Sequence, residues 1–501
     1  MSFAFRFFDL AEAVRFFSQP FPFPSRLKFV ILFSQNFLSR FYKSMKKTIA
    51  SIFVIFAFSI CLFAQNYNDA TLSRVRQQDA TSRDASGKMQ TLAAAEHAFR
   101  ADVYSSNRFF PQAREHWQKI FDVYPTDASV PKALMLTGRS FMWERDYAQA
   151  VVWFEKAFKD YANTKEGRES LAFKGASLVR LGKNAEAANA YQLYTTMFPT
   201  GEKIESSYLN IIDALREVKH YDEANLWVDK TAQRFSEMPT ATNALHARLR
   251  MEISRQSWQR AVEAADALRL LNNFRGSMSS LDEVNFLKAL ALEKLGKKGE
   301  AILLYAAIPN NSYYGGLAND KVNAASNRVS RTGSATAVSV RDYPVLYRAE
   351  LLRYAKSKGV DPRFVLAIMK QESSFRANAK SPAAARGLLQ LVYDTALKYN
   401  RQAGFPQMQA DDLYQPLVNI AIGSQYIAAL KNEFGGMYEA IAASYNGGED
   451  NAARWLARSN PKDAGIFAAE VGFAETKNYV FKVMNNYRVY RELYTDDLVK
   501  R

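Results

Sequence analysis

Apolar residues recur at helical spacing along most of the chain. Between about residues 90 and 310 this pattern is repetitive, and from Tyr343 helical periodicity continues to the end without strand-like alternation of useful length. The segment between them, residues 310–342, shifts to Asn, Ser, Ala, Gly and Thr, as in the end of an array followed by a polar linker. The pattern therefore predicts an all-α protein with two helical domains, and a length of 501 residues suits this organisation.

A short motif recurs in the first helical region, consisting of an aromatic or polar residue, two variable residues and an alanine. It begins at Phe110, Tyr147, Asn184, Tyr221, Trp258 and Lys298, and its alanines are Ala113, Ala150, Ala187, Ala224, Ala261 and Ala301. Four successive intervals are 37 residues long and the last is 40. A large aromatic residue, Trp117, Phe154 or Tyr191, follows each of the first three alanines by four positions. We interpret each unit as a helical hairpin in which the alanine allows close approach and the ring fills the gap. The fixed period predicts an α-solenoid of tetratricopeptide-like repeats.

A helix with a carboxylate on its apolar face is predicted to start at Asp361. Asp361 is followed by proline and can cap the free amides of the first turn. Val365, Ile368 and Met369 then lie on one face of this helix. Glu372 falls three positions further on the same face, where burial would raise its pKa and suit it to act as a general acid. The alternative is a glutamate at a helix end that turns outward to solvent.

The scarcity of cysteine and histidine limits the chemistry of the C-terminal half. The only cysteine is Cys61, so disulfide frameworks, thiolate metal sites and cysteine nucleophiles are excluded downstream. The four histidines all precede residue 250, so the C-terminal half has neither a Ser–His pair nor a histidine metal ligand. Chemistry there must rest on carboxylates, hydroxyls, amides or Lys/Arg, and we predict no metal and no cofactor.

The formal net charge of +16 suits an anionic polymer as partner, such as nucleic acid, a membrane surface or an acidic cell-wall polymer. Residues 1–64 contribute +6 of this charge. A generically basic soluble protein explains the charge equally well. After residue 64 the chain has no Lys/Arg run of the kind found in nucleic-acid-binding tails, so we predict no nucleic-acid partner.

Residues 45–64 have the pattern of a cleaved secretory signal peptide. Basic residues 46–47 precede an uncharged, mostly apolar run that ends at Ala64, and polar sequence begins at Gln65. The run is shorter than the about 20 residues of a membrane span. We therefore predict export, with no stable membrane span in the mature protein.

Two further features concern the N-terminal end. A lipid on Cys61 is the alternative to cleavage after Ala64, but bulky Ile60 before the cysteine disfavours it. Residues 1–44 contain twelve Phe and place a second basic-apolar segment ahead of the signal peptide. We hypothesise that translation begins at Met45, which N-terminal mass spectrometry of precursor and mature protein would test.

Six short motifs follow one another in the C-terminal region, each of which alone reads as a routine helix end or turn. They are Glu372-Ser373, Ser381-Pro382, GLLQL at 387–391, DLYQPLVNIAIGSQY at 412–426, SYNGG at 444–448 and ETKNYV at 475–480. Together and in this order they resemble the soluble lytic transglycosylases, whose catalytic domain is lysozyme-like and similar to goose-type lysozyme. SYYGGLA at 312–318 looks like the segment that precedes the domain in this family. A signal peptide and helical repeats ahead of the domain match the family's large periplasmic members.

The resemblance implies the organisation of the whole chain. A signal peptide at 45–64, preceded by the doubtful segment 1–44, leads into a repeat domain over 65–330, a linker over 331–342 and a catalytic domain over 343–501. The fold class is then all-α, with an N-terminal α-solenoid of helical hairpins and a C-terminal lysozyme-like all-helical domain. The expected location is the periplasm, and by analogy the repeat array would hold a cell-wall protein partner.

The resemblance also implies roles for six residues. Glu372 would be the acid and base, and Glu475 would face the sugar or peptide portion of the substrate. Ser381, Gln390 and Tyr445 would line the cleft, with Tyr445 hydrogen-bonding close to the carboxyl group. Asn446 completes the substrate-binding set.

Three positions depart from the family pattern. Leu389 stands where the family usually has Met, Val392-Tyr393 stand where it has Met-Pro, and Ser444 stands where it has Ala before the Tyr. The change at Val392 affects the expected subsite contacts and leaves the acid untouched. The aromatic residues near the motifs either stack on sugar rings or belong to the core; they are Phe375, Tyr393, Tyr414, Phe473 and Tyr479.

The reaction implied is cleavage of the β-1,4 bond between N-acetylmuramic acid and N-acetylglucosamine in peptidoglycan, leaving a 1,6-anhydro end. Glycosidases normally use a second carboxylate, but an internal nucleophile on the substrate removes that need. No acidic residue lies between Glu372 and Asp394, which fits this scheme, although Asp411, Asp412 or Glu475 remain candidates for a second carboxylate. The alternatives are a muramidase-type hydrolase and a cell-wall-binding scaffold whose lysozyme-like domain only holds glycan.

Overall fold

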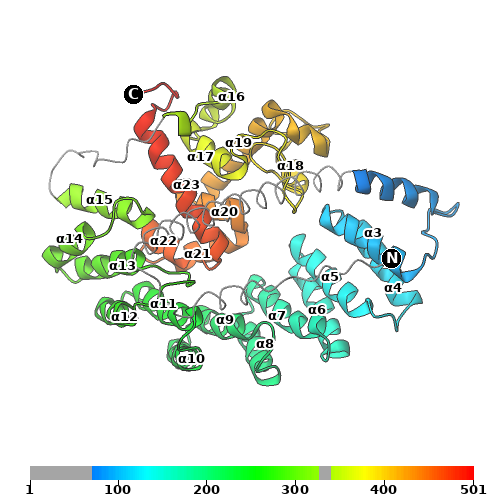
Figure 1. The fold of residues 1–501 in the computed structure, drawn as a ribbon, viewed down its shortest axis with the longest axis horizontal. Coiled ribbons are helices and arrows are strands. Elements are labelled where there is room, and N and C mark those ends of the chain that lie inside the picture. Colours follow the sequence, from blue (N-terminus) through cyan, green and yellow to red (C-terminus); the bar gives the residue numbers. More distant parts are fainter. Residues whose placement is uncertain (1–69, 326–339) are drawn as a thin grey trace, which may run out of the picture. The chain divides into compact units, whose positions relative to one another are not determined.

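The computed structural model describes residues 70–325 and 340–501 (Figure 1). The predicted start at Met45, the signal peptide and Cys61 lie outside these residues, and so does the linker apart from residues 340–342. The described ranges contain helices, turns and isolated bridges but no β-strand, which confirms the all-α prediction. Within them, no helix is long and apolar enough to cross a membrane.

The repeat array is a succession of antiparallel helical hairpins (Figure 1). Its helices are α3 (Ala94–Ser106), α4 (Phe110–Val123), α5 (Val130–Trp143), α6 (Tyr147–Tyr161), α7 (Lys165–Arg180), α8 (Asn184–Met197), α9 (Ile204–Glu217), α10 (Tyr221–Arg234), α11 (Pro239–Ser254), α12 (Trp258–Leu271), α13 (Leu281–Lys294), α14 (Lys298–Ala306) and α15 (Tyr313–Ala325). The six motif starts read from the sequence are the first residues of α4, α6, α8, α10, α12 and α14. The predicted hairpin unit is thus the structural repeat.

Alanine and aromatic side chains pack the hairpins as the motif predicts. All six motif alanines are buried, and so are Trp117, Phe154 and Tyr191. The structure adds a partner that the motif did not include. A Cβ atom at Gly138 would lie 2.7 Å from the Phe154 ring, and one at Gly175 would lie 2.8 Å from the Tyr191 ring. Each ring therefore needs a glycine on the preceding helix, and these two glycines are themselves one repeat apart.

The turn between the two helices of a hairpin also repeats. Arg108, Arg145, Lys219 and Gln256 have left-handed backbone conformations with φ between 58° and 68°, and each lies two residues before the second helix begins. Such a conformation costs a non-glycine residue roughly 1 kcal/mol. At Arg108 and Arg145 the side chains reach the C-terminal domain.

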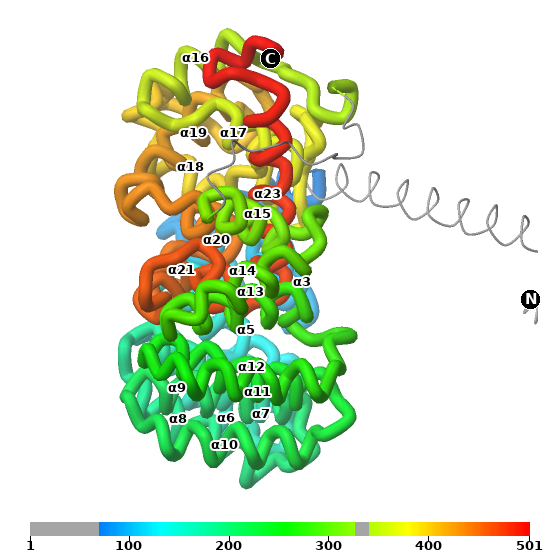
Figure 2. The backbone as a smooth tube through the Cα atoms, turned by 90° about the vertical axis from the view of Figure 1, so that its left-hand side faces the viewer, coloured from blue at the N-terminus to red at the C-terminus, as the bar shows by residue number. Residues whose placement is uncertain are grey.

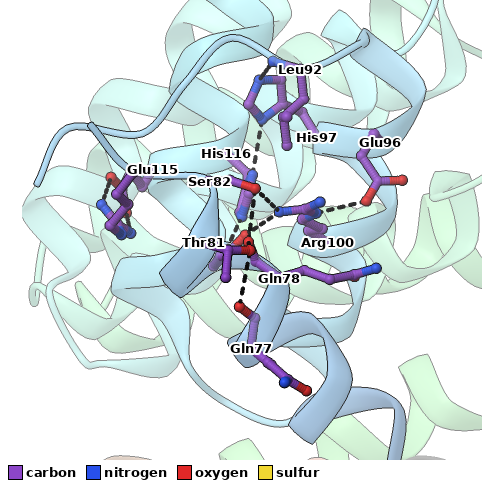
Figure 3. Close-up of polar contacts among 12 residues, drawn as sticks. Gln77, Gln78, Thr81, Ser82, Leu92, Glu96, His97, Arg100, Glu115 and His116 are labelled. Atoms are coloured by element: carbon purple, nitrogen blue, oxygen red, sulfur yellow. Dashed lines mark hydrogen bonds and ion pairs between the residues drawn. The ribbon is translucent and has the colours of Figure 1, made fainter. Parts of the chain in front are cut away.

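The first hairpin is joined to helical residues 71–81 by a buried polar chain (Figure 3). Arg100 Nη1 donates to Asp79 Oδ1 at 2.6 Å, and His116 Nε2 donates to Asp79 Oδ2 at 3.0 Å. His97 Nδ1 lies 2.9 Å from His116 Nδ1, while its Nε2 accepts from the Leu92 amide at 3.0 Å. Both imidazoles are fully buried and bonded on each side, so we assign them a structural role.

The C-terminal domain is a second helical unit around one apolar core. It contains η1 (Val340–Asp342), α16 (Arg348–Tyr354), η2 (Lys356–Lys358), α17 (Pro362–Ser373), α18 (Tyr393–Tyr399), η3 (Ala410–Tyr414), α19 (Pro416–Glu433), α20 (Tyr438–Gly447), α21 (Glu449–Arg458), α22 (Ala464–Glu470) and α23 (Ala474–Leu493). The last helix, α23, packs against α17 and α20 in the domain and against α15 of the array (Figure 2). Helix α23 therefore contacts both the array and the other helices of the C-terminal domain.

Ion pairs join the array to the C-terminal domain along its length. Arg108 pairs with Asp394 at 2.6 Å, and Arg145 pairs with Glu449 and Asp450. Further along the array, Arg216 of α9 and Arg250 of α11 pair with Glu470 of α22. Tyr313 and Tyr314 of α15 are buried, although the polar composition of this segment predicted few apolar anchors.

Candidate active site

The predicted acid lies at the end of a helix that forms as the sequence indicates. The Asp361 side chain accepts from the Arg363 amide at 2.9 Å and caps α17. Val365, Ile368 and Met369 are fully buried. Glu372 is in the last turn and partly buried, and so the outward-turned alternative is not the one adopted.

The carboxyl group of Glu372 has a phenol as its hydrogen-bond partner and no cation. Tyr479 Oη donates to Glu372 Oε1 at 2.6 Å. No lysine, arginine or histidine of the described ranges pairs with it. Burial raises the pKa of Glu372 to about 7, and the charge of Glu475 adds to the rise while the Tyr479 hydrogen bond opposes it. Both the protonated and the ionised form of the group are therefore accessible near neutral pH.

The loop that contains GLLQL is held beside the acid by side chains from other elements. Ser373 Oγ donates to the Leu388 carbonyl at 2.8 Å, and the Leu389 amide donates to Asn419 Oδ1 at 2.8 Å. A Cβ at Gly387 would lie 2.1 Å from the Leu413 carbonyl oxygen, so only glycine fits there. The sequence showed the glycine but did not indicate Asn419 as the residue that holds the loop.

Two of the predicted cleft residues lie in this loop or in the turn that precedes it. Gln390 Nε2 donates to the Ala379 carbonyl at 3.0 Å and to the Gly387 carbonyl at 2.8 Å. Ser381 Oγ accepts from the Ala385 amide at 3.1 Å. The amide nitrogen of Gln390 and the Ser381 hydroxyl therefore shape the loop and the turn before it.

The remaining predicted residues come from α20 and α23. Tyr445 Oη donates to the Leu389 carbonyl, in the loop beside the acid, at 2.6 Å. Burial, with the nearby Glu372 charge, raises the Tyr445 pKa well above its ordinary value. Asn446 is exposed, and its Oδ1 accepts from Thr476 Oγ1 at 2.6 Å. Glu475 is exposed at the start of α23.

Tyr479 is the functional residue that sequence reasoning missed, since we placed it only among stacking or core aromatics. It is buried, and burial together with Glu372 raises its pKa well above the ordinary value, so the phenol stays a donor. A signal for it was present in ETKNYV. Tyr479 follows Glu475 by four residues on a helix, which places both on one face.

Of the candidates for a second carboxylate, Asp411 and Asp412 are engaged away from Glu372, as is Asp394, whereas Glu475 is not. Asp394 pairs with Arg108, and Asp411 is exposed and lies 3.6 Å from Arg386. Asp412 accepts from the Gln409 amide at 2.8 Å in the capping of η3. Glu475 is the acidic residue whose charge acts on Glu372.

The three departures from the family pattern find places in the fold. Leu389 is fully buried, and a Cβ on Gly423 would lie 2.3 Å from its Cδ1. Ser444 is fully buried in α20. Val392 is the N-cap residue of α18 and is partly buried, with its carbonyl accepting from the Ala396 amide at 2.9 Å.

A metal site needs several His, Cys, Asp or Glu side chains close together. In the part of the chain that the structure describes, no three His, Cys, Asp or Glu side chains are placed together to hold a metal ion.

The site consists of a carboxyl group with a raised pKa at the end of α17, beside a loop that contains a glycine. Residues 351–467 match the family of the transglycosylase SLT domain. This match confirms the resemblance of the C-terminal domain to the soluble lytic transglycosylases.

Relatives agree with this assignment at the level of the domain. The chain is 31% identical over 151 residues to the soluble lytic murein transglycosylase of Salmonella typhimurium, covering 30% of this chain and 23% of that protein. It is 36% identical over 126 residues to a putative soluble lytic murein transglycosylase of Haemophilus influenzae, covering 25% and 21%. The chain thus spans less than a quarter of the length of these relatives.

Solved structures with similar chains include an inactive mutant of the lytic transglycosylase Slt from Pseudomonas aeruginosa, with a TM-score of 0.48, 15% identity and coverage of 85% of both chains. The 70 kDa soluble lytic transglycosylase of Escherichia coli has a TM-score of 0.46, 18% identity and coverage of 84% of both chains.

Proposed function

We propose that this protein is an exported lytic transglycosylase that cleaves the β-1,4 bond between N-acetylmuramic acid and N-acetylglucosamine in peptidoglycan. Glu372 would act first as acid and then as base. The observation that carries the proposal is the state of Glu372: burial without a cation raises its pKa to about 7, close to the value that serves both proton donation and proton removal.

The reaction needs one proton-transfer group and a nucleophile that belongs to the substrate. Protonated Glu372 gives its proton to the glycosidic oxygen as the C1–O bond breaks, so N-acetylglucosamine leaves as an alcohol and charge develops at muramoyl C1. The Glu372 carboxylate then removes the proton of the muramoyl C6 hydroxyl, whose oxygen bonds to C1. Glu372 ends protonated, the product carries a 1,6-anhydro ring, and no water is consumed.

The neighbouring side chains have supporting roles in this scheme. Tyr479 holds one carboxyl oxygen, which leaves the other free to face the sugar. Gln390 and Tyr445 keep the loop at residues 387–391 in place, and Ser381 closes the turn before it. We propose that this turn, the loop and Asn446 line the glycan site. Glu475, exposed at the start of α23, would contact the sugar or stem peptide. The engagement of Asp394, Asp411 and Asp412 elsewhere supports a single-carboxylate mechanism.

Digestion of purified sacculi with the recombinant protein tests the proposal. We expect mass spectrometry of the soluble products to show 1,6-anhydromuramoyl ends, which are lighter by one water than reducing ends. Reducing muramoyl ends would identify a hydrolase, and binding without release of fragments would identify a scaffold. Either result would contradict the proposal.

The predicted domain organisation, periplasmic location and cell-wall partner remain part of the same proposal. Detection of the processed protein in the periplasmic fraction, beginning at Gln65, would support export.

A further inference from the structure

One face of α23 is bound to the repeat array. Lys477, Phe481, Met484 and Arg488 follow at intervals of four, three and four residues, so they form one stripe of the helix. Phe481 stacks on the Tyr313 ring with centroids 4.8 Å apart, and Arg488 Nη2 donates to the Tyr313 carbonyl at 3.4 Å. The stripe therefore docks the helix on α15 and its neighbours.

Lys477 is the charged member of this stripe, and its partner comes from the array. Its Nζ donates to Glu283 Oε1 at 2.7 Å, and His246 Nε2 lies 2.8 Å from the same oxygen. All three side chains are at most 3% exposed. Glu283 lies in the first turn of α13, where the helix N-terminus also favours a negative charge. Burial alone would raise the pKa of Glu283, but Lys477 and His246 lower it overall.

The charged groups around this pair reinforce the arrangement. Arg250 and Glu470 act on Lys477 with opposite signs, the arginine opposing its charge and the glutamate favouring it. Burial lowers the pKa of His246 to about 4, so its ring is neutral at neutral pH. Glu283 is thus the carboxylate that holds the Lys477 ammonium group in the interior.

The opposite face of α23 carries the groups that act on the acid. Tyr479 follows Lys477 by two residues, which is a rotation of about 200° around a helix. Its hydroxyl bonds Glu372, and Thr476 beside it bonds Asn446. A rotation of α23 about its own axis that displaces Lys477 also displaces Tyr479 relative to Glu372, because one helix carries both side chains.

We propose that Glu283 is a positioning residue for the acid: through Lys477 it sets the rotation of α23 and thereby the hydrogen bond from Tyr479 to Glu372. The inference rests on the proposed function, since it assigns to the array a part in the same reaction. The array is then a structural component of the active site and does more than hold a partner.

The test is Glu283→Gln in the full-length protein, assayed on soluble uncrosslinked peptidoglycan strands across pH. The substitution leaves Lys477 as a buried cation with only a neutral amide, so the helix should shift. We expect kcat to fall about tenfold with KM within about twofold of the original. We also expect the alkaline limb of the kcat/KM profile to move upward, because the Tyr479 hydrogen bond that lowers the Glu372 pKa is weakened.

Two further variants separate positioning from general destabilisation. In a Tyr479→Phe background, Glu283→Gln should cause no further movement of the alkaline limb, since its effect passes through the missing hydroxyl. Adding Lys477→Met to Glu283→Gln removes the unpaired charge and should restore kcat to within about threefold.

Glu217→Gln is the matched control, because it breaks another partly buried ion pair between the array and the C-terminal domain, with Arg458 of α21. It should lower the melting temperature and leave the alkaline limb where it is. An unchanged limb in folded Glu283→Gln protein, or equal shifts in both Tyr479 backgrounds, would overturn the inference. An active Glu372→Gln variant would instead overturn the proposed function.

Discussion

Glu372 and Glu470 are both carboxyl groups that folding removes from water, yet their ionisation is opposite. Glu470 accepts from Arg216 at 2.8 and 2.6 Å and from Arg250 at 3.1 Å, and it is fully buried. Burial would raise its pKa, but the two guanidinium groups lower it to about 2. Glu372 has one phenol and no cation, and its pKa is raised to about 7.

The difference shows that burial alone does not decide the state of a carboxyl group here. The cost of burying a charged carboxylate is offset by two arginines at Glu470, at the interface with the array. At Glu372, at the end of α17, no cation offsets it. Compensation makes Glu470 a fixed charge that holds two domains together. Its absence makes Glu372 a group that can give and take a proton near neutral pH.

The largest expected effect follows from replacing the uncompensated group. Glu372→Gln should lower the rate of fragment release from sacculi by about 1000-fold or more, because both proton transfers are lost. In contrast to its activity, the stability of the Glu372→Gln variant should increase relative to the original protein. The folded protein binds the Glu372 proton more tightly than the unfolded chain, so stability falls as pH rises from about 4.5 to about 7.

This loss is absent from the glutamine variant. Relative to the original protein, Glu372→Gln should therefore gain up to about 3 kcal/mol between pH 5 and pH 8 in urea unfolding, since one pKa unit corresponds to about 1.4 kcal/mol. A stability difference between the two proteins that does not vary with pH would show that folding does not raise the pKa of Glu372.

The second largest effect is expected at Glu470, whose buried charge is paired with arginines. Glu470→Gln should lower the free energy of unfolding by about 3–5 kcal/mol, because Arg216 and Arg250 lose their buried partner. In the original protein the Glu470 contribution is fully present above pH 4.5 and is lost as pH falls toward 2. Urea titrations at pH 7 and pH 3 measure both effects.

A surface pair of the same interface serves as control. Arg108→Gln removes the pair with Asp394, whose carboxylate side chain is 48% exposed, and should change stability by less than about 1 kcal/mol. An equal loss in Arg108→Gln and Glu470→Gln would contradict the role of burial.

The smallest effect sharpens the role of the phenol. Tyr479→Phe removes the hydrogen bond that opposes the rise in the Glu372 pKa, so that pKa should increase by about one unit, as expected for one hydrogen bond to a carboxylate. The alkaline limb of the kcat/KM profile should move upward by the same amount. Tyr445→Phe is the comparison, because its hydroxyl bonds a carbonyl, and a larger shift there would reverse the assignment.

The local features of the chain were predictable because they depend on neighbours in sequence. The 37-residue motif marked the start of each second helix of the array, and Asp361 with the apolar residues after it defined α17 and the position of Glu372 on it. What these patterns could not contain were partners distant in sequence. Gly138 beneath Phe154, Asn419 at the GLLQL loop and Tyr479 at the acid each come from another helix.

The sequence by itself determined an all-α fold, the register of its repeats and one carboxylate on an apolar helix face, since helix periodicity and capping are local. Only the tertiary structure decided which buried carboxylates meet a cation. Glu283 and Glu470 lie on helices that meet lysine or arginine across the domain interface, whereas Glu372 meets Tyr479. The pKa of a carboxyl group depends on the charges and hydrogen-bond donors within a few ångströms of it. For Glu372 and Glu470 these groups belong to residues that are 107 and 254 positions away in the chain.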